Sequence, residues 1–316
     1  MATTSDPLLT GAADALAARP PLTPGRLAWR RFRRHRMAMF GLALLILLLL
    51  YVIVGSVIFS EKYANYNDIA IKLQPPSAAH PFGTDAVGRD VLARTVYGGQ
   101  ISLLIGLSAV AVALVVGSAV GALSGYYGKW VDSILMRFTE AMLCIPQLFL
   151  LIVAAKFLSD KVQNFQLLSR QMSGGVIIII VIIGLDSWML LARIVRSQFL
   201  SLKQRDFVLA ARCIGTSNRS IILRHILPNT LAPIIVNATL GVAAAVLTEA
   251  YISFLGLGVR QPTATWGNML ENTNKFLETA PWLWLFPGLL ILLTVLAINF
   301  VGDGLRDALD PRSRPA

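Results

Sequence analysis

The sequence DFVLAARCIGTSNRSIILRHILPN, at residues 206–229, is a basic segment rich in turn-forming residues that lies between two long apolar runs. Asp206 is placed to cap the start of a helix. Four residues then recur at i, i+3, i+4 and i+7, which puts them on one helical face: Phe207, Ala210, Ala211 and Ile214. Gly215 is expected to end this helix, because glycine readily adopts the left-handed conformation that follows a helix terminus. The pattern predicts a helix of about nine residues, roughly 13 Å long.

This short helix has two interpretations. An amphipathic helix can lie on lipid headgroups, or it can enter a groove on another protein. The small Ala210 and Ala211 between the larger Phe207 and Ile214 give the face low relief, which favours docking on a protein. Farther along, Pro228 is expected to stop a second short helix where the next apolar run begins.

Long apolar runs recur along the rest of the chain. Hydrophobic residues make up 55% of the sequence and charged residues 14%, against roughly 25% charged residues in an ordinary soluble domain. A helix needs about 20 mostly apolar residues to cross a hydrocarbon core about 30 Å thick. Six runs are apolar enough to do so: 38–59, 101–123, 134–158, 176–192, 232–254 and 282–301. Because backbone groups in lipid must be hydrogen-bonded internally, the sequence predicts an all-α polytopic membrane protein with six transmembrane helices.

The distribution of Lys and Arg predicts the orientation of these helices. With the N-terminus inside, 19 of the 28 Lys and Arg residues fall on the inner side, which agrees with the positive-inside rule. Both termini and the segment at 206–229 are therefore predicted to be cytoplasmic. The predicted regions are an N-terminal tail at 1–37, a first helix with its outer segment at 38–100, a five-helix core at 101–302 that contains a cytoplasmic loop at 193–230, and a C-terminal tail at 303–316.

Other function classes find little support among the residue types. The net charge of +11 is explained by topology and anionic membrane lipid, since the basic residues flank apolar runs and form no groove for nucleic acid. The three His and two Cys residues are too scattered to predict a metal site or a disulfide. The Gly128–Lys129 pair is followed by Trp130, so no phosphate-binding loop is present in the sequence. We expect no catalytic residues, no cofactor and no ATPase activity in this chain.

Several small or special residues predict helix packing. Three glycines recur every four residues in the second apolar run and give it a smooth face that another helix can approach closely: Gly117, Gly121 and Gly125. Pro146 and Pro287 are expected to kink or loosen the helices that contain them.

The stretches LAARCIG at 209–215 and HILPN at 225–229 resemble the coupling-loop signature of binding-protein-dependent ABC importer permeases. That signature reads Glu-Ala-Ala, three residues, Gly, nine residues, Ile-x-Leu-Pro. Five residues match it: Ala210, Ala211, Gly215, Leu227 and Pro228. Leu209 replaces the Glu, and His225 replaces the Ile. Three further stretches resemble the dipeptide/oligopeptide permease subunit of the OppC/DppC type: HPFGTDAVGRDVLARTVYGGQISL at 80–103, SFLGLGVRQPTATWGNML at 253–270 and GDGLRDALDPR at 302–312.

The resemblance implies a type I ABC importer permease (MetI-like) fold and a division of labour between proteins. A second homologous permease subunit would complete the pathway, two ATP-binding subunits would drive it from the cytoplasm, and an extracytoplasmic solute-binding protein would deliver the solute. Ala210, Ala211 and Gly215 would then dock and turn the coupling loop, and Leu227 and Pro228 would anchor it to the fifth helix. Peptides are the expected solute, and nickel complexes or another small solute are the alternative.

Ionisable residues within the apolar runs are candidates for the translocation pathway, since placing a charge in lipid costs roughly 2.5–3.5 kcal/mol or more. Arg137 and Glu140 fit a mutually paired or snorkelling couple better than a pathway role. For Asp186, pathway lining and structural pairing have equal support. Glu249 lies near the outer end of the fifth run, where it could meet the ammonium group of a peptide, although exposure at the interface is slightly favoured.

Two points about the outer side and the mechanism stay open in the sequence. The outer segments at 60–100 and 259–280 could dock a binding protein and cap the bundle, or could re-enter the headgroup layer. A secondary transporter is a rival class, but it would be expected to show inverted internal repeats, which the sequence lacks, and it would leave the coupling loop unexplained.

Overall fold

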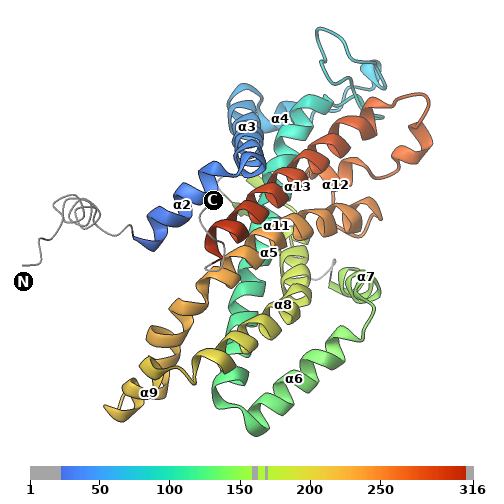
Figure 1. The fold of residues 1–316 in the computed structure, drawn as a ribbon. Helices are drawn as coiled ribbons and strands as arrows, with labels where there is room; N and C mark the ends of the chain where they lie inside the picture. The colour runs from blue at the N-terminus through green and yellow to red at the C-terminus, as the bar shows by residue number, and fades with distance from the viewer. Residues whose placement is uncertain (1–22, 159–162, 168–169, 311–316) are drawn as a thin grey trace, which may run out of the picture.

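The structure is a computed structural model that describes residues 23–158, 163–167 and 170–310 (Figure 1). Residues 1–22 and 311–316 of the predicted tails lie outside this range. The long helices are α3 (Arg36–Ile58), α5 (Val91–Tyr127), α8 (Gly175–Leu202), α11 (Leu231–Phe254) and α13 (Trp282–Leu309). The shorter elements are α2 (Pro24–Arg34), α4 (Glu61–Ala64), η1 (Ile69–Ile71), α6 (Lys129–Leu143), α7 (Gln147–Leu158), α9 (Asp206–Cys213), α10 (Asn218–Ser220), η2 (Ile221–Ile226), η3 (Leu227–Thr230), α12 (Trp266–Met269) and η4 (Thr273–Phe276). A small antiparallel hairpin pairs β1 (Phe165–Leu167) with β2 (Arg170–Met172).

The predicted all-α fold with six membrane helices is confirmed. Five helical segments of the described chain are long and apolar enough to span a membrane, and the bent pair of α6 and α7 gives a sixth when it is counted as one span. The two ends of the chain support an even number of crossings. Phe32 of α2 packs against Ala308 of α13, and Arg31 Nη1 donates to the carbonyl of Asp310 at 3.0 Å. α2 precedes the first span, and Ala308 and Asp310 lie at the C-terminal end of the last span. Since these two regions touch, they lie on the same side of the bundle.

The third span is broken more sharply than the sequence suggested. α6 and α7 meet at an angle of 86°, and Pro146 stands immediately before α7. The single run predicted at 134–158 is therefore two helices, because proline cannot donate the backbone hydrogen bond that would continue α6. Pro287 has a smaller effect, since α13 continues through it.

The second span begins earlier than its hydropathy suggested. α5 starts at Val91, where the Asp90 carboxylate caps the helix by accepting from the amide of Ala93 at 2.8 Å. Its first turns are polar and rich in glycine, and they pack against Trp266 of the other outer segment, whose Nε1 donates to the carbonyl of Thr95 at 2.8 Å. Arg89 Nη1 donates to Gln261 Oε1 at 2.7 Å, which also joins the two outer segments. These contacts fit a capping role, and docking of a binding protein stays a prediction.

The surroundings of Tyr63 in the outer segment shift the pKa of its hydroxyl group. Burial raises the pKa of the Tyr63 hydroxyl, and the nearby Asp90 carboxylate raises it further by charge and by a hydrogen bond of 3.5 Å. The Asp90 carboxylate also lies 2.8 Å from His80 Nδ1. Asp90 therefore holds the outer segment against the start of α5.

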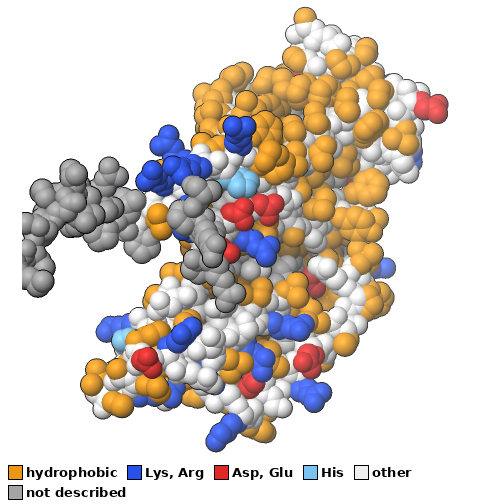
Figure 2. All heavy atoms as spheres, in the orientation of Figure 1, with side chains coloured by type: hydrophobic (Ala, Val, Ile, Leu, Met, Phe, Trp, Pro, Cys, Tyr) orange, Lys and Arg blue, Asp and Glu red, His pale blue; other side chains and the backbone are white. Residues whose placement is uncertain are grey.

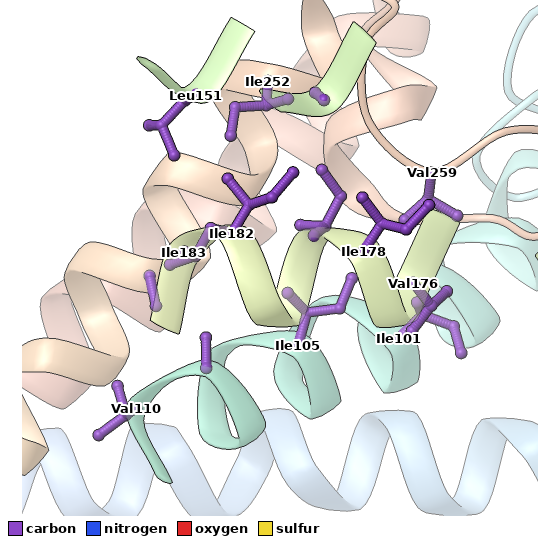
Figure 3. Packing of buried hydrophobic residues seen from close by; sticks show 14 of the residues in the cluster. Ile101, Ile105, Val110, Leu151, Val176, Ile178, Ile182, Ile183, Ile252 and Val259 are labelled. Atoms are coloured by element: carbon purple, nitrogen blue, oxygen red, sulfur yellow. The ribbon is translucent and has the colours of Figure 1, made fainter. Parts of the chain in front are cut away.

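The centre of the bundle is the contact between α5 and α8. An added Cβ at each of the three predicted glycines would lie within 2.7 Å of α8: Gly117 against the Trp188 carbonyl, Gly121 against the Ala192 carbonyl and Gly125 against Phe199 Cβ. The two backbones therefore touch, as the glycine spacing predicted. Farther along the same two helices, branched residues of both helices belong to one buried cluster, and Figure 3 shows Ile105 of α5 directed toward α8.

We predict that Gly121→Ala lowers the free energy of unfolding by about 1–3 kcal/mol, because the new methyl group would overlap the α8 backbone. The measurement is denaturant unfolding of the purified protein in detergent micelles. Gly288→Ala is the matched control, since nothing lies within 4 Å of its added Cβ and it should be neutral or stabilise by up to about 1 kcal/mol. Equal effects of the two substitutions would contradict the close contact between α5 and α8.

Candidate functional site

The predicted coupling helix is present as α9, which spans Asp206–Cys213. Arg205 is the N-cap, so Asp206 is the first helical residue and not the cap that the sequence suggested. Gly215 has a φ of +78° and ends the helix in the expected left-handed conformation. Its amide donates to the Arg212 carbonyl at 2.9 Å, and the Thr216 amide donates to the Ala211 carbonyl at 3.0 Å. This pair of bonds is the Schellman motif, which fixes how the chain leaves α9.

The two faces of α9 differ in exposure. Val208 and Ala211 are buried in a cluster with Phe199 of α8 and with Ile221 and Ile226 of η2. Among the apolar residues that face outward, we call three the exposed edge of α9: Phe207, Ala210 and Ile214. Leu209 is exposed as well. Ile214 is 82% exposed. The expectation that all four predicted residues share one outward face is wrong for Ala211, whose small side chain lets α9 pack closely on the bundle.

The chain after α9 also departs from the sequence interpretation. Pro228 does not separate a short helix from the fifth span, because Asn218–Phe254 forms one helical path. Within that path η2 is a π-helix and η3 a 3₁₀-helix, and Pro228 lies in the first turn of η3, where a proline is tolerated. Leu227 packs on the buried cluster beneath α9, so the predicted anchoring position does contact the bundle.

Polar contacts tie the loop to the ends of α5, α6 and α8. Tyr126 Oη donates to Asn218 Oδ1 at 2.7 Å, and Lys203 Nζ donates to the Gly125 carbonyl at 2.8 Å. Arg196 of α8 makes a two-pronged ion pair with Asp132 of α6, with N···O distances of 2.5 and 2.6 Å. Two parallel charge-assisted bonds fix the relative orientation of the two helices as well as their separation.

Asp186 lies in the middle of α8 and lines a cavity of about 600 Å³ between α5, the break of α6 and α7, α8 and α11. The carboxylate is buried, with 7% of the residue exposed. Its Oδ2 accepts a hydrogen bond from Gln147 Nε2 at 2.5 Å. Asp186 therefore has a hydrogen-bond partner and faces a cavity, and a place for this cavity in the translocation pathway stays a prediction.

Glu249 is completely buried, so the favoured expectation of exposure at the interface is wrong. Ser102 of α5 and Ser253 of α11 donate to its two carboxylate oxygens at 2.9 and 2.8 Å, and Thr265 adds another hydrogen bond. The Ser102 hydroxyl also accepts from the amide of Trp266 at 3.1 Å. Glu249 thus holds together α5, α11 and the segment around α12, and it does not line the cavity that contains Asp186.

Arg137 and Glu140 are both exposed on α6, and no ion pair joins them in the described part of the chain. Mutual pairing is therefore wrong, and snorkelling stays a prediction; the carboxylate that joins α6 to α8 is Asp132, two residues before the predicted apolar run. Among the described residues, no group of three or more His, Cys, Asp or Glu side chains is arranged to hold a metal ion.

Comparison with known proteins agrees with this architecture. The family described as the binding-protein-dependent transport system inner membrane component matches residues 117–315, and the N-terminal transmembrane domain of oligopeptide transport permease C matches residues 23–76. The chain belongs to this family of transport permeases. It is 41% identical to the dipeptide transport system permease protein DppC of Alkalihalophilus pseudofirmus, with 93% of this chain and 91% of that protein aligned. It is also 41% identical to the oligopeptide transport system permease protein OppC of Escherichia coli, over 92% and 93% of the two chains, and 39% identical to OppC of Haemophilus influenzae, over 92% and 90%.

As a permease subunit, the chain is a component of an inner-membrane transport system and not an enzyme.

The sequence analysis did not identify two pairs of residues that interact in the structure. Asp132 and Arg196 are 64 positions apart, and nothing in either local pattern pairs them. Gln147 follows Pro146 in an apolar stretch, so a lone polar residue next to a helix-breaking proline was the available signal for its contact with Asp186.

We predict that Glu249→Ala lowers the free energy of unfolding of this permease by about 2–3 kcal/mol, because it leaves buried hydroxyl groups without an acceptor. Glu249→Gln should cost less, since an amide retains one acceptor oxygen. The measurement is denaturant unfolding in detergent micelles. The control is Glu278→Ala at an exposed position, which should change stability by no more than about 0.5 kcal/mol. A stable Glu249→Ala protein would show that the carboxylate does not organise this region.

Proposed function

We propose that this permease is one of two homologous membrane subunits of an ABC importer that carries peptides across the inner membrane. Two separate ATP-binding subunits supply the energy through the loop at 206–228, and an extracytoplasmic binding protein delivers the peptide. The observation that carries the proposal is an apolar edge on α9 that is exposed in this chain, while Val208 and Ala211 of the same helix are packed against the bundle. The family match and the names of the peptide-transporting relatives support the assignment.

The position of α9 favours a protein partner over lipid headgroups. The apolar run in α8 ends near residue 192, and the helix continues for ten more residues to Leu202. At 1.5 Å per residue this extension is about 15 Å long, which exceeds the roughly 5–7 Å of headgroup region in each leaflet. Since α9 packs under Phe199 of this extension, its exposed edge stands beyond the headgroup layer.

The surface charge supports a cytoplasmic location for this end of the molecule. Figure 2 shows Lys and Arg side chains gathered over α2 and around α6 and α9, whereas the surface around α3 is largely apolar. The positive-inside rule then places both termini and α9 in the cytoplasm, where ATP is available. Anionic lipid would contact the basic residues of α2, several of which precede the first span.

The proposed mechanism is mechanical. ATP binding brings the two ATP-binding subunits together and displaces α9, which is seated in a groove on one of them. The buried contacts of Val208 and Ala211 carry this displacement to α8 and η2, and the spans α8 and α11 tilt so that the outer side opens. Coupling of this kind requires an element with two discrete arrangements rather than a flexible tether. The Schellman turn and the ion pair between Asp132 and Arg196 provide the required stiffness.

The function is tested by reconstituting this permease in lipid vesicles with its second permease subunit, its two ATP-binding subunits and its binding protein. We expect a labelled dipeptide to accumulate only when ATP is supplied on the side of the ATP-binding subunits. Accumulation without those subunits would contradict the proposed energy source. Uptake of nickel or of another small solute in place of the dipeptide would retain the transporter class and reject the peptide assignment.

We predict that Gly215→Val uncouples ATP hydrolysis from uptake, whereas Gly215→Asn retains most of the uptake. No atom lies within 4 Å of an added Cβ at this position, so the two substitutions differ chiefly in how well they tolerate the φ of +78°. A left-handed conformation costs a β-branched residue about 1–2 kcal/mol, and Asn adopts it more readily. Peptide uptake per ATP hydrolysed is the measurement, with membrane insertion checked for both variants. Normal coupling in Gly215→Val would show that the fixed turn after α9 is dispensable.

A further inference from the structure

The cavity beside Asp186 is an unusual place for a carboxylate. Most of the side chains that line the cavity are apolar. The polar ones are Gln147, Asp186, Ser187 and Asn237, of which only Asp186 is ionisable. No Lys, Arg or His is among the described residues that line it. Among the residues that the structure describes, no basic side chain is therefore available to neutralise Asp186 within the cavity.

The hydrogen bonding of Asp186 is incomplete. Gln147 Nε2 binds Oδ2, and no described residue donates to Oδ1. The contrast with Glu249 is direct, because there Ser102 and Ser253 bind the two oxygens and Thr265 adds a further bond. A neutral amide can orient a buried carboxylate but cannot neutralise it, so the open oxygen leaves room for a cationic group.

A second observation agrees with a cavity that water or a solute can enter. Residues 144–146 between α6 and α7 line it and are not helical, although they lie within a membrane-spanning pair. Non-helical backbone at membrane depth is tolerated where it is buried in protein or lines a cavity open to water or solute. Gln147, the partner of Asp186, is the first residue after this break, so the break and the carboxylate belong to one site.

We propose that Asp186, oriented by Gln147, binds the cationic amino group of the transported peptide as it passes through the permease. The cavity volume of about 600 Å³ lies within the range of small-ligand sites, roughly 300–1,000 Å³. The surrounding apolar residues, such as Leu114 and Met142, would contact peptide side chains without selecting among them. The sequence suggested Glu249 as the residue that meets the ammonium group. Because hydroxyl groups already donate to both of its carboxylate oxygens, we assign this role to Asp186 instead. The inference rests on the proposed peptide transport.

The native Cys144 provides a test, because it is exposed and lines the same cavity. The complete membrane complex is reconstituted without its binding protein, so that the selectivity of that protein does not enter. Alkylation of Cys144 by a maleimide is then followed by peptide mass spectrometry, which separates it from Cys213. We expect a dipeptide with a free amino group to slow this alkylation at about tenfold lower concentration than its N-acetylated analogue.

Variants of Asp186 sharpen the comparison. In Asp186→Asn the two dipeptides should protect Cys144 at similar concentrations, whereas Asp186→Glu should keep the preference for the free amino group. Ser187→Ala, at a neighbouring lining position, should also keep that preference. The wild-type comparison needs no variant, so it stands even if Asp186→Asn does not fold.

Several results would overturn the inference. Equal protection by the two dipeptides in the wild-type complex would show that the amino group is not recognised. Loss of the second permease subunit on purification of Asp186→Asn, with unchanged dipeptide preference, would show that the partner subunit supplies the cation. If the vesicles described above import the dipeptide but neither dipeptide protects Cys144, the inference alone fails. If they import no peptide at all, the proposed function fails with it.

Discussion

The contact between α5 and α8 sets the positions of the other parts of the molecule. Three glycines on α5 allow the α8 backbone to approach so closely that a single added carbon would overlap it. In lipid the hydrophobic effect does not drive helices together, so close packing of this kind has to supply the association energy. α8 carries Asp186 in its middle and leads into α9 at its end, and the glycine contact therefore fixes the positions of the cavity and of α9 relative to α5.

The two buried carboxylates differ in how completely their oxygens are hydrogen-bonded. Glu249 is enclosed by hydroxyl groups from three separate segments, and its position explains why the outer segment around Trp266 folds down onto α5. Asp186 has one amide partner and borders a cavity. A fully bonded carboxylate serves to hold structure together, because any new ligand would have to break existing bonds. A carboxylate with an open oxygen can exchange one partner for another, which is what a transport pathway requires.

The sequence predicted features that depend on local pattern and missed those that depend on tertiary contacts. The six spans, the glycine face of α5 and the turn at Gly215 follow from hydropathy, spacing and backbone preference, and they are present. Helical periodicity grouped Ala211 with the exposed edge, but the side of α9 that carries Val208 and Ala211 packs on the bundle. A residue as small as alanine fits equally well on an exposed or a buried face, so its type gave no signal. The burial of Glu249 depends on the Ser102 hydroxyl, 147 positions away, as well as on Ser253 and Thr265 nearby, so no local signal separates it from an exposed acid. The angle at Pro146 was also beyond prediction, because proline fixes where a helix breaks and packing decides how far it bends.

α9 is connected to the walls of the cavity in two ways, through α8 and through α11, and the two connections differ in stiffness. Phe199, which packs on α9, and Asp186 are 13 residues apart on the same unbroken helix, about 20 Å along its axis. On the other side α9 connects to α11 through η2 and η3, where the hydrogen-bond pattern changes from π to 3₁₀ before regular helix resumes. Such irregular turns deform more easily than an α-helix. A displacement of α9 should thus move α8 as a rigid body while the joint before α11 bends, and the walls of the cavity, which those two helices share, would change their separation.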